Sequence, residues 1–144
     1  MKIKKLIKFI FFISIFINSY SNAETVFFDS KNIKIEENGN MIFATKGKAK
    51  IPSSNLVIEG DKFIYNKKDS ELIIIDNVKY FDSENNIHIK SEKIIYNENE
   101  NSVFSKSDTF IKIKDIYNIN SSDILFDRNL NKIISNQITN LIDP

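Results

Sequence analysis

This 144-residue chain has almost no cysteine or histidine, the residue types most used for metal binding and nucleophilic catalysis. The chain has no cysteine, and its only histidine, His88, stands beside Lys90 in an alternating stretch that turns it outward. Metal sites need clustered ligands, so the sequence predicts no metal centre and His88 is interpreted as a solvated surface residue. The glycines, Gly39, Gly47 and Gly60, are too widely spaced to form a phosphate-binding loop.

Asp61 and Glu92 are the best candidates for a pair of catalytic carboxylates, because they occupy matching positions in two similar stretches. Each comes at the start of an apolar run, where such side chains commonly hydrogen-bond to the backbone of a turn. We favour that turn interpretation, which also explains the numerous serines. The sequence therefore predicts no catalytic residue, no cofactor and a protein that is not an enzyme.

These carboxylates belong to a repeat that organises the whole chain. The segment GDKFIYN at residues 60–66 returns as SEKIIYN at residues 91–97, with weaker copies at 30–36 and 121–127, so the unit recurs every 30 or 31 residues. A polar turn and a second apolar run follow each copy, which is the pattern of a hairpin. Units at a nearly fixed period indicate a stacked architecture. We expect one all-β domain of stacked, twisted antiparallel hairpins on two opposed sheets, built from strands of about six residues.

Alternation of apolar and polar residues assigns a face to each position of the repeated strands. The positions expected to face inward, one above the other, are Ile33, Ile35, Phe63, Tyr65, Ile94, Tyr96, Ile124 and Phe126. The strand centres are apolar on the opposite face as well, which predicts a second layer against it; these residues are Phe43, Ile64, Ile73, Ile95, Phe104, Leu125 and Ile134.

The first 23 residues differ from the rest. Four lysines precede an apolar stretch that ends in small residues at Ala23, which is the layout of a cleaved secretory signal peptide. A retained membrane anchor is the alternative, although the apolar stretch is shorter than the ~20 residues that span a bilayer. Without this segment the chain has 16 basic and 19 acidic residues, a balance that argues against a nucleic-acid partner.

The last repeat is shorter than the others. Its apolar residues Ile133, Ile134 and Ile138 are followed by Leu141 and Ile142, and the sequence then stops at Pro144 before a fourth strand. An open strand edge is a template for another strand. We therefore expect Ile133, Ile134 and Ile138 to form an assembly edge, used either for end-to-end stacking or by the continuation of a longer chain.

Tandem units of this form after a signal peptide resemble the OstA-like family of bacterial lipopolysaccharide transport proteins. The resemblance covers nearly all of residues 27–142 and centres on 61–66 and 92–97. It implies a twisted β-jellyroll over residues 24–144 and an exported protein that is periplasmic or associated with the outer membrane. It also implies a module that carries lipopolysaccharide, with the lipid A acyl chains in an apolar groove lined by the eight inward residues. The implied partners are other OstA-like domains, paired end to end, and the outer-membrane assembly complex. The family's glycine before the third strand is present only at Gly47, with Asn77 and Asp108 in the later repeats.

Two alternatives remain open on the residues alone. The chain is either a short bridge protein or the front of a longer assembly barrel. The repeats also fit a structural or adhesive β-solenoid that carries no lipid, because the sequence does not reveal whether the interior is a groove or a filled core.

Overall fold

The computed structural model describes residues 26–143, so the predicted signal peptide, residues 1–23, lies outside the described residues. Those residues form nine antiparallel strands of one sheet, joined in chain order from β1 to β8, with β9 also paired to β7. No helix within 26–143 is long and apolar enough to cross a membrane. The all-β antiparallel fold predicted from the repeats is confirmed.

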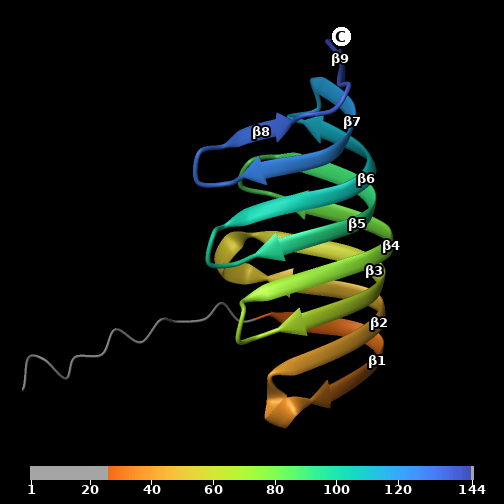
Figure 1. Cartoon of the computed structure of the whole chain (residues 1–144), viewed down its shortest axis with the longest axis vertical. Helices are drawn as coiled ribbons and strands as arrows, with labels where there is room; N and C mark the ends of the chain where they lie inside the picture. The colour runs from red at the N-terminus through yellow and green to blue at the C-terminus, as the bar shows by residue number, and fades with distance from the viewer. Residues whose placement is uncertain (1–25, 144) are drawn as a thin grey trace, which may run out of the picture.

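The strands stack along the long axis of the molecule, from β1 at one end to β8 and β9 at the other (Figure 1). Seven of them have 10 to 12 residues, whereas the last two are short. Their bounds are β1 Phe27–Glu36, β2 Met41–Ile51, β3 Leu56–Asn66, β4 Glu71–Asp82, β5 Ile87–Asn97, β6 Ser102–Ile113, β7 Tyr117–Asp127, β8 Lys132–Ser135 and β9 Asn140–Ile142.

Each long strand bends near its middle, so the single sheet folds back into two walls. We call residues 32–45, 62–75, 93–105 and 124–135 wall A, and residues 27–30, 47–59, 78–90, 108–121 and 140–142 wall B. The pairing register shifts at the bend between Glu59 and Lys62, Ile75 and Val78, Lys90 and Ile94, and Ser105 and Asp108. The hairpin turns of both walls lie along the opposite edge, on the left in Figure 1. We call that edge the mouth.

The strands are longer than expected, and the two opposed sheets are the two halves of one folded sheet. Asp76, Asn77 and Ser107 adopt positive φ at β-bulges inside continuous strands, where the sequence suggested that one strand ends and another begins. A bulge and a turn draw on the same residue types, because both need the left-handed backbone region. The 30-residue repeat is consequently one hairpin of two long strands.

The apolar faces of the two walls meet to form the core. The ring of Phe28 in wall B reaches across to Phe63 and Tyr65 in wall A, with ring centroids 6.0 and 6.2 Å apart. Gly47 permits β1 to lie close to β2 at the bend, since a Cβ there would stand 2.1 Å from the carbonyl oxygen of Asp29. The second layer predicted over the opposite face of wall A is not supplied by residues 26–143, and that face remains partly exposed.

Candidate functional site

The space between the walls holds six of the eight positions predicted to face inward. All six are at most 3 % exposed, and they line wall A in pairs on alternate strands: Phe63, Tyr65, Ile94, Tyr96, Ile124 and Phe126. Buried aliphatic residues and Tyr80 of wall B pack against them. Between β2 and β7 side chains from both walls therefore fill the interior, which is apolar except for a buried, hydrogen-bonded group of Ser91, Ser105 and Thr109.

Ile33 and Ile35 on β1 complete the inner row but are not buried. They pair with the buried residues Ala44 and Ile42, which places them on the inner face of wall A. Their side chains are nevertheless 49 % and 63 % exposed, because β1 is the terminal strand and wall B does not cover this corner. They lie on the inner face, as the alternation predicts, but they form the open end of the apolar layer.

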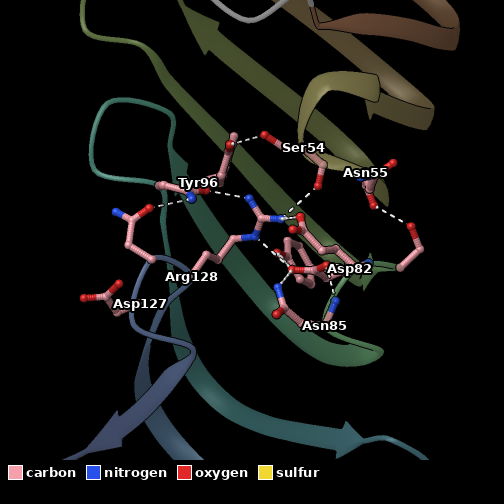
Figure 2. Close-up of polar contacts among 12 residues, drawn as sticks. Ser54, Asn55, Asp82, Asn85, Tyr96, Asp127 and Arg128 are labelled. Carbon is pink, nitrogen blue, oxygen red and sulfur yellow. Dashed lines mark hydrogen bonds and ion pairs between the residues drawn. The ribbon is translucent and has the colours of Figure 1, made fainter.

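Away from the β1 end, an ion pair between Arg128 and Asp82 closes the mouth. Arg128 follows β7 in wall A, and Asp82 ends β4 in wall B, so the contact joins the two walls. The guanidinium Nε donates to Asp82 Oδ2 at 2.8 Å, and Nη2 donates to the main-chain oxygen of Ser54 at the same distance (Figure 2). Nη1 donates to Oδ1 of Asn101 at 2.5 Å. We call this set of contacts the clasp.

The clasp is buried and its polar groups are satisfied. Asp82 is fully buried, and its Oδ1 accepts bonds from the backbone N–H groups of Glu84 and Asn85 at 3.0 Å. Its Oδ2 also accepts from the Asn85 amide at 2.9 Å and from the Tyr80 hydroxyl at 3.4 Å. Near them, the Ser54 hydroxyl and the Tyr96 phenol lie 3.4 Å apart, again from opposite walls. The clasp and the contact between Ser54 and Tyr96 thus cover the apolar layer at the mouth.

The charges of the clasp reinforce each other. Burial alone would raise the pKa of Asp82, but the hydrogen bonds from Arg128 and Asn85 outweigh it and hold the pKa below its ordinary value of 3.8. Burial similarly acts to lower the pKa of Arg128, and the contact with Asp82 overcomes that effect. Burial raises the pKa of Tyr80 far above its usual range, so its phenol stays neutral and able to donate.

Sequence reasoning missed the clasp, although one signal was present. Arg128 is the only arginine among 20 basic residues, all the others being lysine. Arginine carries a planar fork of donors that lysine lacks, which suits it to a buried site where several acceptors converge. A single arginine in a chain that otherwise uses lysine points to such a site, but it does not reveal the partners 46 and 74 residues away.

Other polar features lie outside the apolar layer. A hollow of about 650 Å³ opens on the outer surface near the bend, lined mainly by polar side chains such as Lys90, Glu92 and Asn120. His88 is exposed on the outer face of wall B, with its ring 4.5 Å from that of Phe81. Nowhere in residues 26–143 do three or more histidine or acidic side chains gather where they could hold a metal ion.

The predicted assembly edge is divided between different surfaces. Ile133 pairs with Phe126 on the inner face and packs against the core. Ile134 pairs with Leu125 on the outer face, and Ile138 is 89 % exposed in the segment between β8 and β9. Neither β8 nor β9 has a second neighbour within the described residues, so this edge of the sheet is unpaired, as is that of β1 at the other end.

Comparison with known proteins identifies the same architecture in a solved structure. The crystal structure of LptH from Pseudomonas aeruginosa, described as the LptA homologous periplasmic component of the lipopolysaccharide transport device, superposes with a TM-score of 0.72. The match covers 84 % of this chain and 96 % of that one at 6 % sequence identity. No family model and no curated protein sequence matches. The chain has the open β-jellyroll fold of LptH, which confirms the fold that the OstA-like resemblance implied.

Replacing Arg128 should destabilise the protein strongly, because Asp82 would be left buried without its charged partner. We expect Arg128→Ala to lower the free energy of unfolding by about 3–5 kcal/mol, the typical cost of breaking a buried pair. Arg128→Lys should recover only part of this loss, since one ammonium cannot reach three acceptors in a fork. Urea denaturation measures both variants.

The matched control is Lys112→Ala, which removes a 2.7 Å ion pair with Asp115 on the surface. Exposed pairs contribute at most ~1 kcal/mol, so this variant should remain close to the parent. Equal losses from Arg128→Ala and Lys112→Ala would show that the clasp does not hold the walls together.

The clasp should also make stability depend on pH in the acid range. Because the pKa of Asp82 is lower in the folded protein than in the unfolded chain, its stabilising effect is complete above the ordinary value of 3.8. That effect is lost as the pH falls through the folded-state pKa. The difference in unfolding free energy between the parent and Asp82→Asn should be largest at neutral pH and should shrink below about pH 4. Urea titrations at pH 7, 4 and 2.5 measure it, and a difference that stays constant would contradict the assignment.

Proposed function

We propose that this protein is a non-enzymatic module of lipopolysaccharide transport that holds lipid acyl chains between its two walls. The observation that carries the proposal is the largely apolar inner layer, which extends from β2 to β7 and reaches the surface at Ile33 and Ile35. The fold supports it, because LptH has the same jellyroll and is named as a component of a lipopolysaccharide transport device.

The exposed end of the layer is the place where an acyl chain can first make contact. Ile33, Ile35 and the nearby ring of Phe28 offer apolar surface beside the packed core. Each methylene buried there contributes about 0.8 kcal/mol, so a partly inserted chain is held by several kcal/mol. Further insertion requires the walls to part, since the interior residues beyond β1 already touch across it. The clasp then sets how far the mouth can open near β7.

In this proposal the protein works in the periplasm and passes lipid to similar domains. Residues 1–23 would direct export, and the unpaired edge of β1 would pair with the edge formed by β8 and β9 of a neighbouring jellyroll. Such pairing extends the inner layer from one domain to the next, because strand addition continues both faces of a sheet. The neighbour would be another OstA-like domain of the bridge or the outer-membrane assembly complex.

One observation favours the alternative of a structural or adhesive β-solenoid. The six inner residues of wall A on β3, β5 and β7 are packed to 3 % exposure or less, as in a protein that uses its interior only for stability. A solenoid of this kind would not respond to lipid. Binding of lipopolysaccharide to the inner face is therefore the property that separates the two functions.

A photo-crosslinking side chain tests the proposal at two adjacent positions of β1. Ile35 lies on the inner face and is 63 % exposed, whereas Lys34 is exposed on the outer face through its pairing with Phe43. Incorporated at position 35 in living cells, p-benzoylphenylalanine should capture lipopolysaccharide, detected as a shifted band that reacts with a lipopolysaccharide antibody.

The same side chain at position 34 is the matched control, since it differs only in the face to which it points. It should capture little or no lipopolysaccharide. Equal capture from both positions, or none from either while the protein is exported and folded, would favour the solenoid.

A further inference from the structure

The outer face of wall A carries a row of apolar residues that nothing in residues 26–143 covers. Strand pairing places one member on each strand from β2 to β8, directly beside the next. All are partly or substantially exposed, Leu125 by 36 % and Ile134 by 38 %. We call this row the outer stripe; it consists of Phe43, Ile64, Ile73, Ile95, Phe104, Leu125 and Ile134.

The matching outer row of wall B shows that the stripe is not a general property of the sheet. Pairing there joins Asp29, Lys48, Glu59, Lys79, Lys90, Phe110, Asn120 and Asn140. Only Phe110 among these is apolar, and ion pairs of 2.6 and 3.9 Å join Glu59 to Lys48 and Lys79. The central outer row of wall B is therefore mostly polar, whereas the outer stripe of wall A is wholly apolar and resembles an interface core.

We propose that the outer stripe packs against the same stripe of a second copy, so that two jellyrolls associate back to back through wall A. The two stripes would run in the same direction, related by a twofold axis parallel to the stripe. In this arrangement each stripe residue lies opposite its own counterpart. Like residues meet in any isologous interface, and the stripe is uniform enough in size to pack on itself. The proposal does not depend on lipid carriage.

The charges beside the stripe favour this orientation. On the side toward the turns, pairing joins a row that contains Glu36, Glu71 and Asp127, with one lysine at its end. On the side toward the bend, the row contains Lys62 and Lys93, and Lys62 forms a 2.8 Å ion pair with Asp76 beside it. Rotation about the stripe places the lysine row of each copy over the carboxylate row of the other. Rotation about the strand direction would instead place like charges together, which is unfavourable.

The dimensions of the surface suit a stable dimer. Seven strands at about 4.8 Å spacing and three residues across each strand give a patch of roughly 34 by 20 Å. Two copies would bury about 1,400 Å², within the ~1,200–2,000 Å² range of specific protein interfaces. A lipid surface suits the stripe less well, because these side chains are half-buried among their neighbours and carboxylates and lysines border them equally closely.

Single cysteines test the arrangement on a background that contains none. Ile64→Cys and Leu125→Cys lie two strands to either side of Ile95, at the centre of the stripe. Facing sheets are about 10 Å apart, so a bis-maleimide that spans about 8 Å between sulfurs should join each variant to itself. Purified protein of each variant should give a covalent dimer on a denaturing gel. His88→Cys, on the outer face of wall B, should not.

A matched pair of substitutions measures the contribution of the stripe to association. Ile95→Lys should raise the dissociation constant at least about tenfold in sedimentation equilibrium, because it places a charge at the centre of the interface. Val57→Lys, a half-buried apolar residue on the outer face of wall B, should leave it unchanged. Circular dichroism checks that both variants are folded.

Three results would overturn the proposal. The first is a lack of covalent dimer from Ile64→Cys and Leu125→Cys in a folded protein, which would leave the stripe unpaired with a second copy. The second is a mixture of the two cysteine variants that cross-links only to each other, which would show stripes running in opposite directions. The third is a monomeric parent whose binding to phosphatidylglycerol vesicles is abolished by Ile95→Lys, which would assign the stripe to a membrane surface.

Discussion

Contact between the two inner faces is the constraint on which the rest of this structure depends. The sheet is a single layer, so its apolar face is buried only when each strand bends and brings its two halves together. The bulges near Asp76 and Ser107 provide the bend, and the clasp of Arg128 and Asp82 joins the walls at the opposite edge. Between these two supports the core is packed and aligned with the repeat.

The repeat made the fold predictable, because its period, its alternation and its turn residues all indicate stacked hairpins. The inward positions from Phe63 to Phe126 followed from alternation alone, since register is fixed wherever one face is buried. The continuity of the strands did not follow, because Asp76-Asn77 has the same composition in a bulge as in a turn. The exposure of Ile33 and Ile35 was missed for another reason: alternation assigns a face but does not reveal whether anything covers it. The clasp depends on residues far apart in the chain, which periodicity cannot bring together.

The two faces of wall A have different roles in this account. Its inner face supplies the apolar layer proposed to hold acyl chains, and its outer face supplies the surface proposed for a second copy. A sheet buried on both faces reads as continuously apolar in sequence, which explains why its strand centres lack the polar alternation of wall B. Wall B would then cover the inner face of wall A, and a second copy would cover its outer face, where the sequence predicts a second layer.

The central claim is that lipid enters between the walls, and because the interior is already packed, binding must move them apart. Spin labels on cysteines at Ser53 and Asn99, in exposed turns of walls B and A on the two sides of the mouth, measure that separation by pulsed electron resonance. The account predicts that the distance increases when lipid A binds, while a pair at Lys68 and Asn99 within wall A stays constant. Bound lipid A with an unchanged distance between Ser53 and Asn99 would contradict it.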